Sequence, residues 1–520
     1  MVLSVSGLDR PGDTGAPTSS ALERTLSFRD LVVYGLLFIG PLAPVAVFGV
    51  LDARTSGAVA LVYLLATVAM AFTAWSYAEM SRVVPRAGSV FAYASEGLGR
   101  HAGFLAGWLA MLDYLLIPSV AYLFCGIALH ALVPSVPAWL FTVLAFVVTT
   151  LLNLTGVKMA ATAGSVMLAV EIVVLVLFVA AALTVLVRDG PARPWLTPFL
   201  GVERAALGPR AIADGGSAAG AGLAAIVGAV SIAVLSFLGF DAIASFAEES
   251  AGDSRAVGRA ILVCLAGSGL LFVVQTYLAA VLSPMTPLSL VAIPERQGTA
   301  FYDITRDAIG PWLATVLAAT KAVGPAFAAM TAQAAAARLL FGMARDGHLP
   351  RALASVDARY GVPRAAVVTT GALTLLVSVW AARRSDGLDL LVSIVDIGAL
   401  AAFTLLHASV IGFFAFKADR RTTTLGTAHP RSALHIVVPI LGAAVTVLVI
   451  AEASRVAKLV GHADRRRRDR SILHLGHAST SIILRPRNRV SPDCPGNPDQ
   501  PMAHSSRDDA TMSACPRLTK

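Results

Sequence analysis

Apolar runs of about twenty residues recur along this chain and constrain its fold more than any other feature of the sequence. Most connections between these runs carry charged residues, proline or glycine. A helix of about 20 apolar residues crosses a bilayer and satisfies its own backbone polar groups there. The sequence predicts an all-α polytopic membrane protein with eleven spans, at about 31–51, 57–79, 102–132, 137–155, 160–187, 224–248, 257–283, 311–343, 364–382, 386–416 and 433–453.

The composition agrees with a membrane protein and excludes two other classes. Of the 520 residues, 56% are apolar and 14% are charged, whereas an average soluble domain has about 25% charged residues. Intrinsic disorder needs low hydrophobicity and high charge, so it is excluded for most of the chain. The net charge of +9 does not indicate a nucleic-acid-binding face, because the basic residues lie between the apolar runs and in the C-terminal tail.

Both ends of the chain differ from the apolar domain of residues 31–453. Residues 1–30 lack a short apolar core before a small-residue cleavage site, so we expect an uncleaved, disordered leader. The distribution of Lys and Arg places this leader on the cytoplasmic side of the plasma membrane. Residues 454–520 are basic and low in hydropathy, and we expect them to be disordered. Their composition resembles a shifted reading frame or an alternative ending.

Two of the predicted spans are interrupted at membrane depth. The first reads LVVYGLLFIGPLAPVAVFGV, and Pro41 and Pro44 each remove a backbone donor, so the helix should unwind around Ile39–Pro44. The sixth contains Gly239 between two phenylalanines, and Asp241 follows. These spans open two successive blocks of five helices, and matching interruptions are typical of inverted-repeat secondary transporters. For either helix alone, a packing kink is the alternative.

Three motifs resemble those of amino acid–polyamine–organocation permeases. RVVPRAGSVFAYASEGLGRHAGFLAGWLAMLDY (82–114) resembles their second-to-third-helix signature, SFLGFDAIASFAEESAGDSRAVGRAI (236–261) their sixth helix, and ARLLFGMARDGHLPRAL (337–353) the end of their eighth. The resemblance covers about residues 28–455 and implies the five-plus-five, leucine-transporter-type inverted-repeat fold with broken first and sixth helices. Of the two further helices usual in the family, the twelfth span is missing here. GWLAMLDYLLIPSV, SFLGFD and DIGALAAFTLLHASV look most like bacterial putrescine importers.

The breaks and the resemblance together predict a substrate site near the middle of the bundle. A carboxylate at membrane depth is costly, so Asp113 and Asp241 are candidate anchors for a substrate ammonium group. The structural alternatives are a hydrogen bond to another helix for Asp113 and capping of the broken helix for Asp241. The predicted substrate-binding residues are Ile39, Gly40, Pro41, Leu42, Ala43, Asp113, Tyr114, Ser236, Phe237, Gly239, Phe240 and Asp241.

Other charged residues are candidates for proton coupling or gating. Glu248 and Glu249 lie near Arg255 and Arg259 in the sequence, which predicts a salt-bridge gate or a solvated helix end. Lys321 is expected to form a structural buried pair with an acid, either Glu171 or Asp396. His407 is interpreted as a packing histidine rather than a proton relay. The coupling or gating candidates are Asp241, Glu248, Glu249, Glu171 and Lys321.

The motifs of enzymes and ATP-driven pumps are missing from the sequence. It contains no Walker loop, metal-binding His/Cys spacing or nucleophile elbow, so we expect no enzyme, metal or cofactor. Pro41 and Pro44 remove amides that a substrate carboxylate would need. The first hypothesis is therefore a proton-coupled importer of a small cationic amine, with putrescine as the leading candidate. The alternatives are an amino acid permease or exchanger and, from another class, a channel or membrane sensor.

Overall fold

The computed structural model describes residues 24–133, 135–202, 222–252, 254–357, 359–383, 387–417 and 433–452. Within these ranges the chain is built from helices, and one isolated β-bridge joins Leu26 to Ser250. Among the described residues, nine helices are long and apolar enough to cross a membrane, and a bent pair adds a tenth. The all-α polytopic fold is therefore confirmed, whereas the five-plus-five repeat stays a prediction. The tail at 454–520 and most of the predicted leader lie outside the described ranges.

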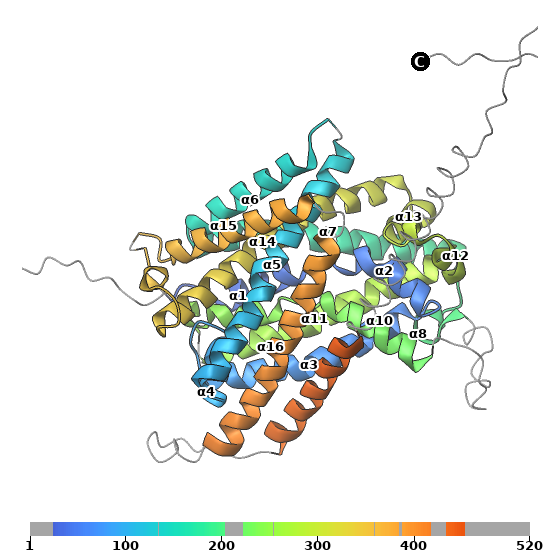
Figure 1. The fold of residues 1–520 in the computed structure, drawn as a ribbon. Coiled ribbons are helices and arrows are strands. Elements are labelled where there is room, and N and C mark those ends of the chain that lie inside the picture. The colour runs from blue at the N-terminus through green and yellow to red at the C-terminus, as the bar shows by residue number, and fades with distance from the viewer. Residues whose placement is uncertain are drawn as a thin grey trace, which may run out of the picture. The chain divides into compact units, whose positions relative to one another are not determined.

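The first block of helices follows the predicted spans (Figure 1). The helix Ala138–Leu154 lies at the predicted span 137–155, has 17 residues and a rise of about 26 Å, and falls short of the length of the other candidate spans. Two short helices, α4 (Val90–Gly97) and α8 (Thr197–Leu200), lie in connections. The longer elements of this block are α1 (Phe28–Ile39), α2 (Pro44–Arg54), α3 (Val59–Val83), α5 (Arg100–Leu132), α6 (Ala138–Leu154) and α7 (Val157–Asp189).

The second block begins with a helix that changes type. The 3₁₀ helix η1 (Phe240–Glu249) continues the span that α10 (Leu223–Leu235) opens, where the sequence predicted one interrupted helix over 224–248. The long helices after it are α11 (Ser254–Leu282), α14 (Pro311–Arg345), α15 (Arg364–Ala382), α16 (Gly387–Ile411) and a final helix, Leu434–Glu452. The short elements are α12 (Pro287–Ala292), η2 (Pro294–Arg296), α13 (Ala300–Ala308), η3 (Arg351–Ala354) and the π-helical η4 (Gly412–Lys417).

Small residues let the long helices approach closely at the centre. α14 packs against α5, where Ala326 and Ala329 share one apolar cluster with Tyr122 and Cys125. Lipid supplies no hydrophobic drive for helix association, so close backbone packing between small residues is what such interfaces rely on. α5 also packs against α16, so α5 contacts both α14 and α16.

The final helix packs through a buried histidine. The ring of His407 on α16 lies against Gly442, where any side chain would collide with it. Its two ring nitrogens bond the hydroxyls of Thr73 at 3.2 Å and Ser76 at 2.9 Å. Both polar atoms of the ring therefore have partners from α3, as expected for a packing histidine.

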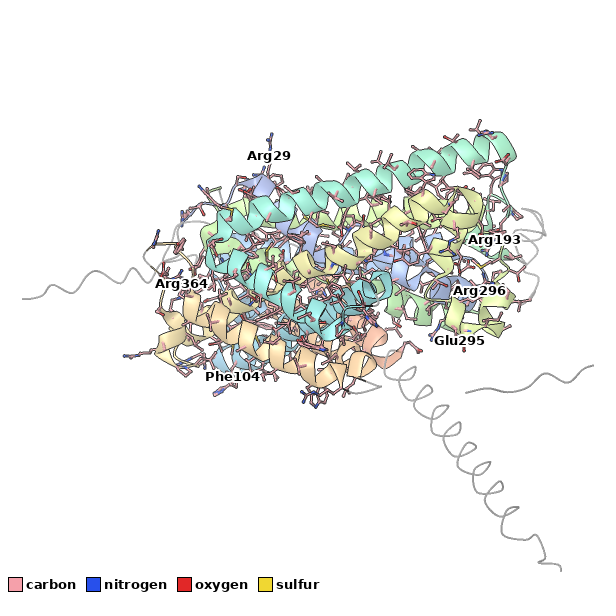
Figure 2. All side chains as sticks on the ribbon, turned by 90° about the horizontal axis from the view of Figure 1, so that it is seen from above. Arg29, Phe104, Arg193, Glu295, Arg296 and Arg364 are labelled. Carbon is pink, nitrogen blue, oxygen red and sulfur yellow. The ribbon has the colours of Figure 1, made fainter. Side chains whose placement is uncertain are left out.

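The bundle has two ends, which Figure 2 separates. Arg29 and Arg364 lie at one end, and Arg193 and Arg296 lie at the other. We call the first the Leu26 end, since Leu26 precedes α1 there, and the second the Asp52 end, after the acid near the end of α2. Both breaks lie between these ends, because α1 and η1 reach toward the Leu26 end while α2 and α10 reach toward the other.

Candidate functional site

The first break joins two helices whose axes differ by 50°. α1 ends at Ile39, and Gly40 follows with a φ of 74°, which glycine adopts without a steric penalty. Pro44 begins α2, a position where its missing amide costs no hydrogen bond. A β-carbon on Gly40 would meet no heavy atom within 4 Å. This break therefore borders open space.

The backbone of the first break offers few free hydrogen-bond donors. Pro41 has no amide hydrogen, and the amides of Gly40 and Ala43 already donate to carbonyls at 2.9 Å each. The Leu42 amide has no partner among the described residues. Gln275 of α11 donates its side-chain amide to the carbonyl of Pro41 at 2.9 Å. A substrate carboxylate would find one unused amide here.

The second break separates α10 from η1. α10 ends at Leu235, and Gly239 closes the intervening turn with a φ of 117°. A β-carbon on Gly239 would lie closer than 3.0 Å to the ring of Phe38 on α1. Unlike the first break, this one is filled, and the two broken spans touch each other through Phe38.

Asp241 lies directly after this turn and is 1% exposed. Its Oδ2 accepts a hydrogen bond from the hydroxyl of Tyr114 at 2.6 Å and a longer one from that of Tyr77 at 3.4 Å. The amide of Gly239 donates to Oδ1 at 3.2 Å. The hydroxyls of Ser89 and Tyr114 share a bond of 3.3 Å. A distance of 2.6 Å is typical of a hydroxyl that donates to a charged oxygen.

Aromatic rings from five helices surround this carboxylate. Phe240 meets the ring of Tyr77 edge to face at 6.2 Å and lies 5.9 Å from Phe403 of α16. Phe38 lies 6.3 Å from Tyr114. The rings exclude water and present π faces that attract cations. The sequence analysis missed Tyr77 and Phe403, because an aromatic residue within an apolar helix gives no signal of its own.

Asp113 precedes Tyr114 on α5 and is 1% exposed. Neither of its carboxylate oxygens has a hydrogen-bond partner among the described residues. It interacts electrostatically with Asp241 and with Asp396 of α16. The structural alternative, a hydrogen bond to another helix, has no counterpart in the described chain. A buried acid without partners is costly, which leaves its oxygens available for a proton or a cation.

Two predicted site residues turn away from Asp241. The hydroxyl of Ser236 bonds that of Tyr63 on α3 at 3.0 Å. Phe237 packs against Phe272 of α11 at 5.0 Å between ring centroids. Both residues thus fasten the break to α3 and α11, while Tyr114, Phe240 and Asp241 come together as one group.

A buried ion pair lies at the Leu26 end. Arg338 of α14 donates two hydrogen bonds to the carboxylate of Glu249, at 2.7 and 3.2 Å. Its guanidinium lies 4.9 Å from the ring centre of Phe246, on which Tyr34 of α1 stacks at 4.8 Å. The amide of Leu26 donates to the carbonyl of Glu249 at 2.8 Å. The segment before α1, η1 and α14 are thereby joined.

The predicted partners of the two glutamates were wrong. Glu248 binds Arg345 at 2.5 and 2.8 Å, and Glu249 binds Arg338, whereas the sequence suggested Arg255 and Arg259. Arg338 and Arg345 lie on α14, far along the chain, so proximity in the sequence selected the wrong cations. Both glutamates are ion-paired rather than solvated.

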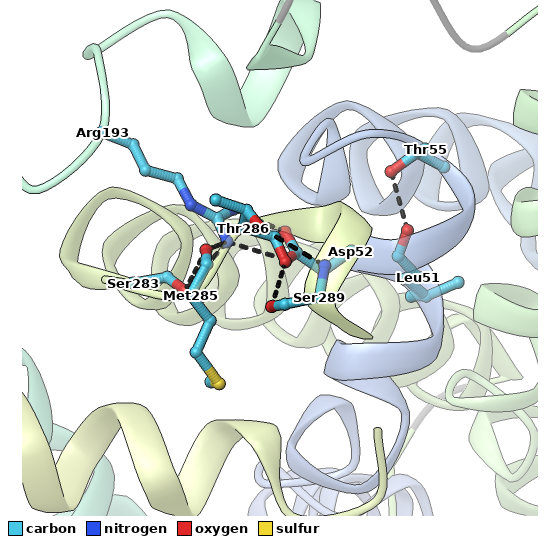
Figure 3. A network of polar contacts seen from close by, with 8 residues as sticks. All are labelled: Leu51, Asp52, Thr55, Arg193, Ser283, Met285, Thr286 and Ser289. Carbon is cyan, nitrogen blue, oxygen red and sulfur yellow. Dashed lines mark hydrogen bonds and ion pairs between the residues drawn. The ribbon is translucent and has the colours of Figure 1, made fainter. Parts of the chain in front are cut away.

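A second buried ion pair lies at the Asp52 end (Figure 3). Arg193 donates to both carboxylate oxygens of Asp52, at 2.8 and 2.9 Å, and to the hydroxyl of Ser283 at 2.9 Å. It also bonds the carbonyl of Met285. This network ties α2 to the segment after α7 and to the end of α11. The sequence analysis did not predict this pair, because nothing local marks Asp52 as the partner of Arg193.

Glu171 and Lys321 lie near each other on α7 and α14. The carboxylate of Glu171 lies beside Gly324, one turn from Lys321, and the two charges interact. No ion pair within 4.0 Å joins them, and Oε2 of Glu171 has no hydrogen-bond partner in the described chain. The described residues also contain no group of three or more side chains that could hold a metal ion.

Known proteins are similar to this chain over most of its length. The family described as amino acid permease matches residues 31–459. The low-affinity putrescine importer PlaP of Escherichia coli K12 is 28% identical over 413 residues, which is 78% of this chain and 85% of PlaP. The branched-chain amino acid permease BcaP of Bacillus subtilis is 25% identical over 414 residues, or 75% and 81% of the two chains.

A plant relative has another class of substrate in its name. The vacuolar cationic amino acid transporter 2 of Arabidopsis thaliana is 28% identical over 421 residues, which is 75% of this chain and 60% of the relative. The family match extends over most of the chain, and the described residues form the long apolar helices of a membrane protein. The chain therefore belongs to the amino acid permease family and is a multi-pass membrane transporter, not an enzyme.

Proposed function

We propose that this permease imports a small cationic amine across the plasma membrane by proton coupling, with putrescine as the leading candidate. One observation carries the proposal: Asp241 is a buried carboxylate at a helix break, held by Tyr114 and Tyr77 within a shell of aromatic rings. A carboxylate at membrane depth binds a cation or exchanges a proton. The name of PlaP supports the substrate class.

A diamine has two ammonium groups, and each needs a partner once it has lost its water. Asp241 would bind one of them. Asp113, next to Tyr114 and without a hydrogen-bond partner in the described chain, would bind the other. The rings of Phe240 and Phe38 would cover the methylene chain, and each ring contact with an ammonium adds about 0.5–2 kcal/mol.

The first break supports an amine over an α-amino acid. A carboxylate needs several donors when it is buried, and the break leaves only the Leu42 amide unused. The open space beside Gly40 would serve as the route by which the substrate reaches Asp241. An amino acid permease is the second candidate, because BcaP and the plant relative carry amino acids in their names. Membership in a transporter family disfavours a channel or a sensor.

Proton coupling and gating are assigned to different acids. Asp241 and Glu171 are the proposed proton carriers, because each is buried and Glu171 has an unpaired oxygen near Lys321. Glu248 and Glu249 are proposed to close the Leu26 end through α14, since their ion pairs have to break before that end can open. With the N-terminus on the cytoplasmic side, this closure faces the cytoplasm.

The experiment is competition against uptake of labelled putrescine into proteoliposomes, for the parent and Asp113→Asn. The substitution should raise the concentration of unlabelled putrescine that gives half-maximal inhibition. The expected loss of binding free energy is about 2–5 kcal/mol, because one ammonium group loses its buried partner. Inhibition by alanine should change much less. Asp307→Asn, at an exposed acid on α13, is the control and should change neither.

Two outcomes would contradict the proposal. An equal loss of inhibition by both compounds would make Asp113 a structural residue rather than an ammonium partner. Uptake of labelled alanine but not of labelled putrescine by the parent would favour the amino acid permease.

A further inference from the structure

A groove at the Leu26 end lies between α3 and α11, away from the proposed substrate site. Its cavity has a volume of about 450 Å³. Gly258 lets the two helices touch, since a β-carbon there would lie 3.0 Å from atoms of Ala78. Beyond this contact, toward the Leu26 end, the side chains of the two helices enclose the groove. The residues that line it are Ala78, Glu79, Arg82, Arg255, Gly258, Arg259 and Leu262.

The lining carries an excess of positive charge. Three arginines face one glutamate, and all three arginines are exposed. Glu79 is shared between Arg82 at 3.0 Å and His435 of the final helix at 3.4 Å. Arg255 and Arg259 lie on successive turns of α11. A groove of this kind attracts an anion, and guanidinium groups suit the paired oxygens of a phosphate.

An apolar track leads from this groove along the same two helices. On α11 the exposed side chains are Leu262 at 39%, Val263 at 49% and Leu270 at 65%. On α3 they include Leu64 at 45%, Leu65 at 39% and Val68 at 52%. Both helices are membrane spans, so these side chains face lipid chains. The cationic groove thus lies at the end of a surface that faces hydrocarbon.

We propose that this groove binds the headgroup of an anionic phospholipid. The phosphodiester contacts Arg82, Arg255 and Arg259, and the acyl chains follow the track along α3 and α11. Basic pockets between membrane helices bind such headgroups. Inorganic phosphate shares the contact with the arginines but has nothing to place on the apolar track, so it binds more weakly than the lipid.

Native mass spectrometry of the full chain in detergent tests this site. The probes are phosphatidylglycerol, phosphatidylcholine and inorganic phosphate, and the variants are Arg255→Gln/Arg259→Gln and a control, Arg351→Gln/Arg359→Gln. The control removes two exposed arginines from the same end but outside the groove. The parent should bind phosphatidylglycerol at least tenfold more tightly than phosphatidylcholine. The groove variant should lose most of that preference, and the control should keep it.

Three results would overturn the proposal: equal binding of the two lipids by the parent, an equal loss in the control variant, or complete displacement of the lipid by millimolar phosphate. If the groove variant cannot be purified, the salt dependence of lipid binding by the parent alone tests the proposal. Binding of phosphatidylglycerol should fall severalfold between 0.05 and 0.5 M NaCl, because salt screens exposed charges. Binding that does not change with salt would exclude the arginines as its source.

Discussion

The two helix breaks present different chemical groups to the centre of the bundle. The first borders open space at Gly40 and offers backbone groups, most of them already bonded. The second is packed against Phe38 and offers the carboxylate of Asp241. A broken helix can thus provide either open space for a substrate or a charged group that binds it. We expect recognition of a cation to depend on the second break and passage of the substrate to depend on the first.

The largest effect is expected from removal of the charge at the second break. Asp241→Asn should lower gradient-driven putrescine uptake by on the order of 100-fold or more, because a buried ammonium group loses its counter-charge. Uptake into proteoliposomes measures this, and size-exclusion chromatography checks that the variant folds. Unchanged accumulation by a folded variant would remove Asp241 from the transport mechanism.

A smaller effect should separate the two glycines. Gly239→Ala and Gly40→Ala both force a side chain into a positive φ, at a cost of about 1–2 kcal/mol each. Only Gly239→Ala also collides with Phe38, which adds about 1–3 kcal/mol. Thermal unfolding in detergent should show the lower midpoint for Gly239→Ala. Equal midpoints would mean that the second break is not packed as described.

The smallest effect concerns the two tyrosines that hold Asp241. Tyr114 donates at 2.6 Å and Tyr77 at 3.4 Å. Loss of a hydrogen bond to a charged group costs about 1.5–3 kcal/mol, so Tyr114→Phe should raise the KM for putrescine at least tenfold. Tyr77→Phe should raise it less than tenfold. A larger effect at Tyr77 would reverse the assignment of the main donor.

Local sequence chemistry predicted the long helices of the fold and the positions of the breaks. Long apolar runs identify spans because lipid forces backbone groups to bond within one segment. Pro41 and Gly239 mark the breaks, since one removes a donor and the other permits a positive φ. The same reasoning could not tell that residues 240–249 form a 3₁₀ helix.

Contacts between distant helices could not be predicted from local patterns. Arg338 lies 89 positions from Glu249 along the chain, and Arg193 lies 141 positions from Asp52. A single sequence contains no signal for such pairs. Cations close to Glu249 in the sequence, such as Arg255, therefore led to the wrong predicted partner. Tyr77 was missed for the same reason, because only the packing of α3 against η1 brings its hydroxyl to Asp241.

Uptake of labelled putrescine by the parent protein tests the central claim most directly. The protein is reconstituted into proteoliposomes with an imposed pH gradient, acidic outside, and uptake is followed with and without a protonophore. Our account predicts saturable accumulation of putrescine above its external concentration, abolished by the protonophore and inhibited weakly by alanine. Accumulation of alanine but not putrescine, or equilibration of putrescine without accumulation, would contradict it.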